Sequence, residues 1–400
     1  MSVESQAAGT ANVDDESFAQ VLEAVRRFVH SALVPLEQEI EETGRIPPEV
    51  FSQMAELGIF GLSIPPQYGG LGLTATQEVQ LHFALSETSQ GIRYPYGTNV
   101  GIGSRGITLD GTPAQRERYL PRLASGDLIS AFCVTEPEAG SDVASLKTSA
   151  VRKTGPDGRA CYVLNGTKRF ITNADIAGLF TVLARTDPDE KSAKGISAFL
   201  VERDTPGLSI GKPEKKLGQR GGNICDVIFE DVVVPEESLL GGVEGRGFAA
   251  AMRTLDAGRL SVAANCIGQM RRAIDEAARY ALERRQFGRP VAEFQLVQGL
   301  LADSETDWFA AKSVVLEAAR AYDAAGKAAQ QAACAKYFAS EALGRVADRC
   351  LQVLGGSGYI ADYPLERIYR DARVSRIYEG TSQIMQLVIA KGLLKSLREA

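Results

Sequence analysis

The chain contains 400 residues, and its 44 Lys and Arg against 50 Asp and Glu give a formal charge of −6. This balance excludes the basic excess that is typical of nucleic-acid-binding domains. No stretch approaches 18 consecutive apolar residues, so we expect no membrane-spanning helix. The length exceeds what one hydrophobic core usually holds, which predicts two or three domains.

Cysteine and histidine usage limits the chemistry further. The six cysteines are scattered without a CxxC pair, which predicts reduced thiols and a cytoplasmic location rather than disulfides or a zinc site. The two histidines, His30 and His82, are too few and too isolated for a metal cluster. We therefore expect no metal ion.

The first part of the chain predicts a tail followed by helices. Residues 1–15 have no apolar run and no arginine, which predicts a mobile tail rather than a targeting segment. Residues 16–127 predict an N-terminal helical domain, because apolar residues recur at three- and four-residue spacing. Within it, the segment IPPQYGGLGL is rich in proline and glycine and predicts a loop.

Residues 128–242 predict a small antiparallel β domain. The segment ACYVLNGTKRFIT has β-rich runs on both sides of Asn165-Gly166, which predicts a hairpin at that dipeptide. The alternating segment ISAFLVERD and the β-rich segment VIFEDVVVP predict further strands.

Residues 243–400 predict a C-terminal four-helix bundle, because three long segments each carry an apolar stripe. The motif LDAGR, residues 255–259, is expected to open the first long helix, and the glycines from Gly355 onward to end the third. The predicted fold class is therefore mainly α with a central β domain, in the order N-terminal helical domain, antiparallel β domain and four-helix bundle.

Short motifs in this framework each allow two interpretations. CVTEPEAGSD, residues 133–142, predicts an irregular loop that either holds a flavin edge and a phosphate or only connects two elements. ERRQFGRP, residues 283–290, could bind a phosphate or place cations at a helix C-terminus. In RIYEGTSQIM, Glu379 could be a catalytic base or a solvated residue at a helix start.

Taken together, these segments resemble the acyl-CoA dehydrogenase family. The matching pieces span nearly the whole chain in the family's order: IPPQYGGLG, CVTEPEAGSD, LNGTKRFITN, VIFEDVVVP, LDAGR, ERRQFGRP, FQ, LQVLGGSGY and IYEGTSQI. Each piece alone has low specificity, and their ordered occurrence in one chain carries the resemblance. The family's architecture of helices, β domain and helical bundle matches the one predicted above.

The resemblance implies FAD as cofactor, bound between the β domain and the bundle with help from a neighbouring subunit. On one subunit, the implied FAD contacts are Phe132, Val134, Thr135, Ser141, Phe170, Thr172, Thr381 and Gln383. From the neighbouring subunit, they are Arg284, Gln286, Phe287, Gln352 and Gly356. Gln295 matches a Gln of the family and is a further implied cofactor contact. The chain departs from the family at three places: Phe170 replaces a frequent Trp, Gln286 replaces a hydroxyl residue, and Phe294 replaces a frequent His.

The resemblance also implies that Glu379 is the catalytic base, which removes the α-proton of an acyl-CoA thioester while the β-hydrogen leaves as hydride to FAD. Burial beside an apolar substrate would raise the proton affinity of such a carboxylate. Some family members place the base on the LDAGR helix, where this chain has Ala257 and Gly258, and neither can act as a base. The implied substrate contacts are Ser141, Asp256, Arg259 and Gly380.

The implied electron acceptor is an electron-transferring flavoprotein, and the implied assembly is a homotetramer, a dimer of dimers. A short acyl-CoA oxidase-like or nitroalkane oxidase-like flavoenzyme, a non-catalytic flavoprotein scaffold, and an acyl-CoA-binding bundle without flavin are the alternatives.

The segment GIRYPYGTNVGIGS, residues 91–104, is expected to lie near the acyl pocket. Its side chains Arg93, Tyr94 and Tyr96 suggest a substrate other than a plain long saturated chain, or else they pack between helices. The acyl chain length and the pathway stay open.

Overall fold

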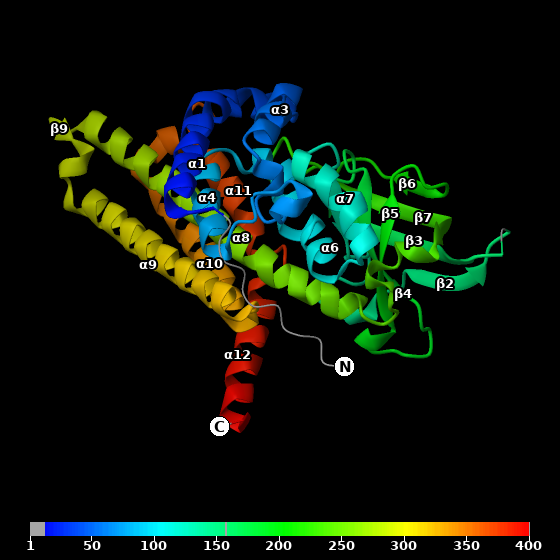
Figure 1. The fold of residues 1–400 in the computed structure, drawn as a ribbon. Coiled ribbons are helices and arrows are strands. Elements are labelled where there is room, and N and C mark those ends of the chain that lie inside the picture. Colours follow the sequence, from blue (N-terminus) through cyan, green and yellow to red (C-terminus); the bar gives the residue numbers. More distant parts are fainter. Residues whose placement is uncertain (1–12, 157, 400) are drawn as a thin grey trace.

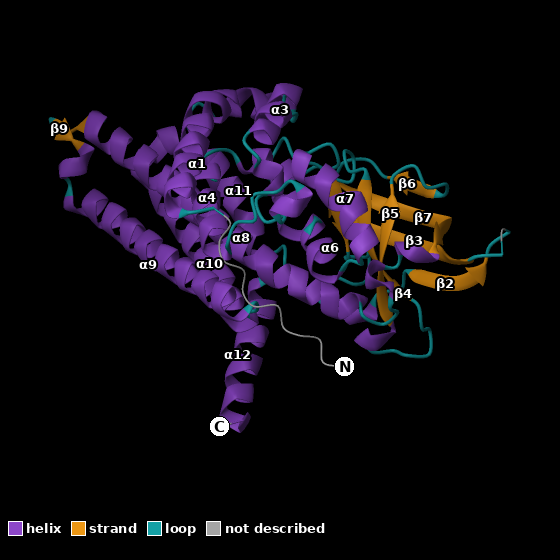
Figure 2. Cartoon of the chain, viewed as in Figure 1, coloured by secondary structure: helices purple, strands orange, loops and turns teal. Residues whose placement is uncertain are grey.

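The described residues fold into two helical regions with a seven-stranded β sheet between them in the sequence (Figures 1 and 2). The computed structural model describes residues 13–156 and 158–399, so most of the tail predicted for residues 1–15 lies outside the described residues. The arrangement of helices, sheet and long helices confirms the predicted fold class.

The N-terminal region consists of helices joined by short turns. Its α-helices are α1 (Asp15–Phe28), α2 (Glu37–Thr43), α3 (Pro48–Glu56), α4 (Ala75–Leu85), α5 (Tyr94–Thr98), α6 (Arg105–Asp110) and α7 (Pro113–Ser125). Thr74 and Thr112 begin α4 and α7 with capping boxes, in which the threonine hydroxyl accepts the N–H of a glutamine three residues later. These caps satisfy backbone donors that the first helical turn leaves free.

The β sheet follows. Its strands are β1 (Ser130–Cys133), β2 (Ser149–Thr154), β3 (Ala160–Thr172), β4 (Leu179–Arg185), β5 (Ile196–Glu202), β6 (Leu208–Ile210) and β7 (Ile224–Pro235). The strand order is β1-β4-β2-β3-β7-β6, and β5 pairs with β4. The prediction of an antiparallel domain needs one correction, because β1 pairs with β4 in parallel, as does one residue pair of β2 and β4.

The predicted hairpin at Asn165-Gly166 is wrong, because both residues lie inside the continuous strand β3. The chain instead reverses between Thr154 and Ala160, where β2 pairs with β3. Glycine is needed at position 166 because of a close approach: a Cβ atom there would lie 2.5 Å from the Thr148 hydroxyl oxygen. The pairing register with β7 shifts at this point, as expected for a β-bulge.

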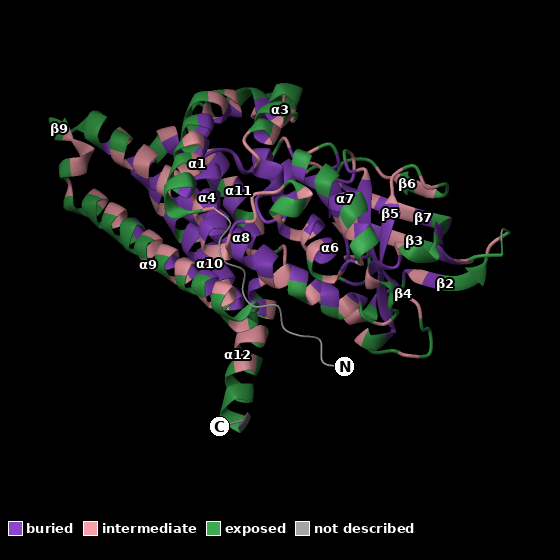
Figure 3. Cartoon of the chain, viewed as in Figure 1, coloured by how far each residue is buried: buried purple, intermediate pink, exposed green. Residues whose placement is uncertain are grey.

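The C-terminal region is built around three long helices that lie side by side (Figure 1). Its elements are α8 (Gly247–Glu283), β8 (Arg285–Gln286), β9 (Arg289–Pro290), α9 (Gln295–Ala325), α10 (Ala329–Leu354), α11 (Pro364–Ala372) and α12 (Ser382–Glu399). Many of the buried residues between α8, α9 and α10 are alanines, whose small side chains permit close helix packing. Helix α12 projects from the bundle, and it and the outer face of α9 are largely exposed (Figure 3).

Helix α8 also corrects a prediction. It begins at Gly247, so LDAGR lies about two turns inside the helix and does not open it. Asp256 is therefore not a helix cap. Its side chain and that of Arg259 are held in the middle of a rigid element, which restricts where they can point.

Two features are absent from the described residues. None of their helices combines the length and the apolar character needed to cross a membrane. Within the same residues, no group of three or more His, Cys, Asp or Glu side chains is arranged to hold a metal ion.

Candidate active site

Glu379 lies in the turn that precedes α12. Its φ of +51° is a left-handed conformation that is uncommon for a residue with a side chain. The Oε2 atom of Glu379 is buried and has no hydrogen-bond partner among the described residues. The carboxylate lies against α8 at Gly258, where an added Cβ atom would come within 2.3 Å of Oε2. The turn and the glycine together make room for a free carboxylate in the interior.

The carbonyl groups of this turn are held by two cations. Lys336 Nζ on α10 donates to the Gly380 carbonyl at 2.6 Å, and Arg259 Nε on α8 donates to the Glu379 carbonyl at 3.4 Å. Arg259 is itself paired with Asp256, with 2.8 Å between Nη1 and Oδ1. The structure therefore brings the predicted substrate contacts Asp256, Arg259 and Gly380 next to Glu379.

The electrostatics of the turn affect the basicity of its carboxylate. Burial raises the pKa of Glu379 above its ordinary value, and the cations of Arg93, Lys336 and Arg259 offset part of that increase. Removing a charged group from water disfavours its charged form, which makes the carboxylate a stronger base.

Arg93 is a second unusual group next to the turn. Its side chain is buried, and its Nη2 donates to the Tyr378 hydroxyl at 3.2 Å. The Nε atom has no partner, and no carboxylate of the described residues lies within 4.0 Å of its nitrogens. The Tyr96 hydroxyl is also buried without a partner. Residues 91–104 thus contribute a polar and cationic wall beside Glu379.

The predicted flavin loop is held by a buried ion pair. Glu136 points inward and accepts hydrogen bonds from the Lys147 and Thr148 backbone N–H groups, at 2.6 and 3.0 Å. It also accepts one from Lys168 Nζ at 2.7 Å, and Lys168 donates to the Val134 carbonyl at 3.3 Å. Glu136 is thus an internal anchor, and it fixes the loop that carries the predicted cofactor contacts Val134, Thr135 and Ser141; Phe132 lies in β1, just before this loop.

The same region brings Phe170 and Thr172 of β3 to this loop. The N–H of Arg169 donates to the Thr135 carbonyl at 2.8 Å, which ties the loop to the strand. Phe170 has a φ of +58°, and 51% of its side chain is exposed. Ser141, at the far end of the loop, is exposed as well. An exposed aromatic ring on a rigid strand offers a flat surface for another ring.

The remaining predicted cofactor contacts lie elsewhere. Arg284 caps the C-terminus of α8, and about 39 Å of helix separates it from Gly258, at 1.5 Å per residue. Figure 1 shows the β8–β9 hairpin at the end of the bundle opposite the sheet. A hydrogen bond of 3.1 Å between Tyr280 and Ser357 joins the end of α10 to the same place. The residues that gather there are Arg284, Gln286, Phe287, Gln295, Gln352 and Gly356.

Backbone strain is concentrated at the predicted contacts. Six non-glycine residues of the described chain have positive φ, and three of them are Phe170, Phe287 and Glu379. Strained residues persist where the surrounding structure fixes them, and they cluster at functional sites. Thr381 and Gln383, the last two predicted cofactor contacts, directly follow the strained turn at the start of α12.

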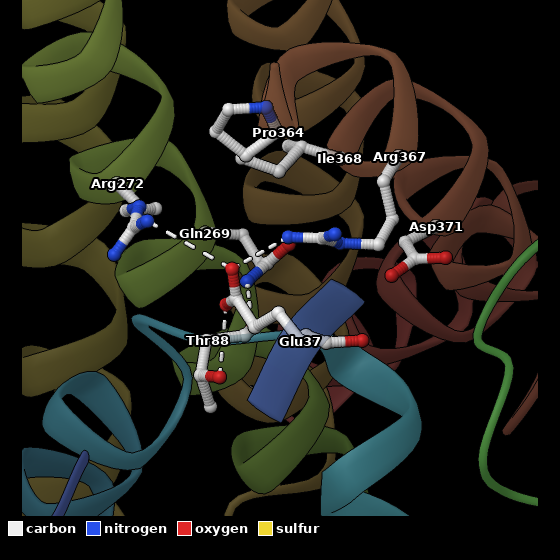
Figure 4. A pocket seen from close by; sticks show the side chains of 9 residues that line it. Glu37, Thr88, Gln269, Arg272, Pro364, Arg367, Ile368 and Asp371 are labelled. Carbon is white, nitrogen blue, oxygen red and sulfur yellow. Dashed lines mark hydrogen bonds and ion pairs between the residues drawn. The ribbon is translucent and has the colours of Figure 1, made fainter. Parts of the chain in front are cut away.

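A further buried polar cluster has no room for a ligand. Figure 4 shows Glu37 of α2, which accepts hydrogen bonds from Thr88 at 2.9 Å and from Arg367 at 2.6 Å. Arg272 of α8 lies 3.8 Å from the same carboxylate. The space between these side chains does not hold a water molecule. The cluster therefore joins the two helical regions and is not a binding site.

Comparisons with known proteins fit this geometry. The N-terminal, middle and C-terminal domain models of acyl-CoA dehydrogenase match residues 15–127, 131–232 and 245–394. The chain belongs to the acyl-CoA dehydrogenase family. It is 40% identical to an acyl-CoA dehydrogenase of Bacillus subtilis over 370 residues, which are 92% of this chain and 96% of the relative.

Two further relatives extend the comparison. The caffeyl-CoA reductase–Etf complex subunit CarC of Acetobacterium woodii is 42% identical over 358 residues, 89% of this chain and 92% of that protein. The structure of an acyl-CoA dehydrogenase complexed with FAD from Bacillus anthracis superposes with a TM-score of 0.90 at 32% identity, over 97% of this chain and 68% of that one. As a member of this family, the chain is an FAD-dependent oxidoreductase.

The described residues of this acyl-CoA dehydrogenase fit such a cofactor. A flavin ring needs an aromatic or apolar surface and fixed polar groups at its edge. The exposed ring of Phe170 and the loop fixed by Glu136 supply both next to each other. The groups predicted for the adenosine side lie around the C-terminal end of α8, at the end of the bundle opposite the sheet (Figure 1).

The sequence analysis missed two buried lysines that support this site. Lys168 and Lys336 are both fully buried, and each donates to a carbonyl of a predicted site segment. A signal for Lys336 was present, because it interrupts the small apolar side chains of AACAKYFA on the buried face of α10. A single lysine on an apolar stripe predicts a specific buried partner.

Proposed function

We propose that this acyl-CoA dehydrogenase family member removes the α- and β-hydrogens of an acyl-CoA thioester and forms the trans-2-enoyl-CoA. The observation that carries the proposal is the buried Oε2 atom of Glu379, which has no hydrogen-bond partner among the described residues and is held in a left-handed turn against Gly258. A carboxylate without a competing hydrogen bond is free to accept a proton from a substrate.

In this mechanism Glu379 takes the α-proton, and the electron pair left on the α-carbon forms the double bond to the β-carbon. Bound FAD supplies the acceptor for the hydride that leaves the β-carbon. The Glu379 N–H is the proposed donor to the thioester oxygen, where negative charge develops. Arg259 and Lys336 fix this turn through its carbonyls, so the base and the donor keep their relative positions.

The cofactor contacts follow from the same proposal. Phe170 and Thr172 of β3 would hold the flavin together with Phe132, Val134 and Thr135. A second group of residues is separated from the flavin loop by the length of α8 and would contact the FAD of a second copy. This group consists of Arg284, Gln286, Phe287, Gln295, Gln352 and Gly356. Thr381 and Gln383 are proposed contacts beside the base, and Ser141 is a proposed contact to both FAD and substrate.

The first test is Glu379→Gln, which keeps the shape of the side chain but removes the base. In anaerobic titrations with a panel of acyl-CoAs, we expect the wild type to lose its visible flavin absorbance. The variant should retain FAD but bleach 10²- to 10⁴-fold more slowly, the usual range for loss of a general base. Equal rates in the two proteins would contradict the assignment of Glu379.

We further propose a substrate with a polar or anionic acyl end. Arg93 is a buried cation without a bound carboxylate of its own, and a buried charge is costly unless it is paired. An anionic group on the substrate would supply the missing partner. We expect the wild type to prefer an acyl-CoA with a terminal carboxylate over the plain chain of equal length, and Arg93→Met to reverse that order. Equal or higher activity with the plain acyl-CoA of the same length would disprove this idea.

We propose an electron-transferring flavoprotein as the electron acceptor, because a 42% identical relative is named as part of a complex with one. The same relative is named a reductase, so this chemistry can also run toward the saturated thioester, with Glu379 returning the proton. Reoxidation of the reduced protein by electron-transferring flavoprotein and by oxygen, compared under the same conditions, separates this proposal from an oxidase.

A further inference from the structure

Lys336 is a buried cation in an unusual position. It lies in the N-terminal third of α10 with its side chain fully buried. Its hydrogen bond goes to the Gly380 carbonyl, at 2.6 Å, and no carboxylate of the described residues lies within 4.0 Å of its ammonium group. A lysine buried without a paired carboxylate costs stability that an apolar side chain of the same length would not.

The contact is to a strained segment. Glu379 and Gly380 have φ values of +51° and +96°, and the Gly380 backbone lies so close to Met385 that a Cβ atom would come within 2.6 Å of Cε. Such a turn needs anchors to hold it in place. The Arg259 contact to the Glu379 carbonyl is longer, at 3.4 Å, so Lys336 provides the shorter and stronger of the two anchors.

The groups around Lys336 also define its charge. Cys266 and Arg259 face it from α8, Glu341 lies on its own helix, and Glu379 faces it from the turn. Burial lowers the pKa of Lys336 to about 8, so the ammonium form still prevails at neutral pH. Its positive charge is one of those that lower the pKa of Glu379.

We propose that Lys336 is a positioning residue for the reaction, which anchors the Glu379–Gly380 turn through the Gly380 carbonyl and supplies positive charge beside the Glu379 carboxylate. The inference rests on the proposed role of Glu379. At this end of the bundle, α10 carries none of the predicted cofactor or substrate contacts. The proposal gives α10 a direct role in positioning the base.

The test uses the FAD-loaded protein with Lys336→Met and Lys336→Arg. The first readout is amide hydrogen exchange of the peptide that covers residues 376–385, measured without substrate. We expect exchange to be about tenfold faster in Lys336→Met, as for the loss of a hydrogen bond to a charged group, and to return toward the wild-type rate in Lys336→Arg. This readout does not depend on activity.

The second readout is the pH dependence of flavin bleaching by an acyl-CoA substrate. The base must be deprotonated, so the rate rises through the pKa of Glu379. Loss of the neighbouring cation should move this rise upward by about one pH unit in Lys336→Met, whereas Lys336→Arg should leave it close to that of the wild type. Lys216→Met is the matched control. Lys216 also donates to carbonyls, those of Gln219 and Gly222, but it is not among the groups that shift the pKa of Glu379.

The outcomes separate the two proposals. If exchange and the pH dependence of Lys336→Met both match those of the wild type, the positioning role is wrong. Faster exchange throughout α8 and α10 with an unchanged pH dependence would also overturn it, since Lys336 would then only stabilise the bundle. If Glu379→Gln bleaches at the wild-type rate, the proposed base itself is wrong, whatever the exchange data show.

Discussion

At the level of single residues, the free carboxylate of Glu379 depends on the missing side chain of Gly258. A Cβ atom at Gly258 would lie 2.3 Å from Oε2 and 2.8 Å from the Ile102 Cγ2 atom, and both distances are too short for real contacts. Gly258 is in the middle of α8, where glycine is otherwise less favourable than alanine by about 1 kcal/mol. Gly258 therefore lowers the stability of the helix but leaves space beside the base.

We expect Gly258→Ala to displace the carboxylate and lower the rate of flavin bleaching about 10²-fold, the usual effect of moving a catalytic group by about 1 Å. FAD content should stay at the wild-type level, because the three atoms nearest to the added methyl group belong to Glu379 and Ile102 and not to a predicted cofactor contact. The matched control is Gly299→Ala in α9, where an added Cβ atom meets nothing within 4 Å. A bleaching rate unchanged from the wild type in Gly258→Ala would show that the carboxylate does not need this space.

Single residues also show which parts of the candidate site could be predicted from the sequence. Glu379, Arg259 and Asp256 were predicted by resemblance, and they lie together in the structure. Lys336 was not predicted: its place on an apolar stripe indicates a buried partner, but not that this partner is a backbone carbonyl 44 residues away. Backbone hydrogen bonds between distant segments become visible only when the elements are packed.

Among the secondary-structure elements, the long amphipathic helices were the easiest to predict, because their apolar stripes repeat over many turns. The hairpin at Asn165-Gly166 failed since the dipeptide fits both a turn and a bulge. The parallel pairing of β1 with β4 could not be predicted either, because the period-two pattern of a strand is the same in both orientations.

The contact between α11 and the sheet contains a titrating carboxylate. Asp371 is buried, and its Oδ1 accepts a hydrogen bond from the Gln219 N–H in the loop before β7. Gly218 of the same loop lies so close that a Cβ atom would be 2.5 Å from this oxygen. Burial raises the pKa of Asp371 from 3.8 to about 6. The folded protein therefore binds the proton more tightly than the unfolded chain does.

The raised pKa of Asp371 determines how this residue makes the stability depend on pH. The contribution of Asp371 is fully present below pH 3.8 and is lost as the pH rises through about 6, with a total on the order of 2 to 3 kcal/mol. Asp371→Asn keeps an acceptor oxygen but does not titrate. Between pH 4 and pH 7 we expect the free energy of unfolding of this variant, measured by urea denaturation, to fall less than that of the wild type.

Asp307→Asn is a control that should change the pH dependence of stability in the opposite direction. Its carboxylate is paired with Arg345 and Arg349, which lower its pKa despite partial burial. This group contributes stability above its ordinary pKa that is lost as the pH falls, so its removal should weaken the protein at neutral pH and not in acid. If Asp371→Asn and Asp307→Asn changed the pH dependence in the same direction, the assignment of Asp371 would be wrong.

At the scale of the whole molecule, the proposed FAD contacts form two groups that one chain cannot bring together. The β domain carries Phe170, and the β8–β9 hairpin at the opposite end of the bundle carries Phe287 (Figure 1). The Phe287 side chain is 92% exposed and that of Leu296 nearby is 87% exposed. In the proposed assembly, a second copy covers these two exposed apolar side chains.

We expect the purified protein to have about four times the mass of one chain in light scattering, with FAD bound. Phe287→Ser should lower FAD retention about tenfold, because the hairpin of one copy would no longer close over the cofactor of its neighbour. Val151→Ser is the control: Val151 is also exposed, at 52%, but it lies on β2 at the other end of the molecule. A monomer that holds FAD, or equal FAD retention in the two variants, would refute the shared site, since a single chain would then complete the cofactor site alone.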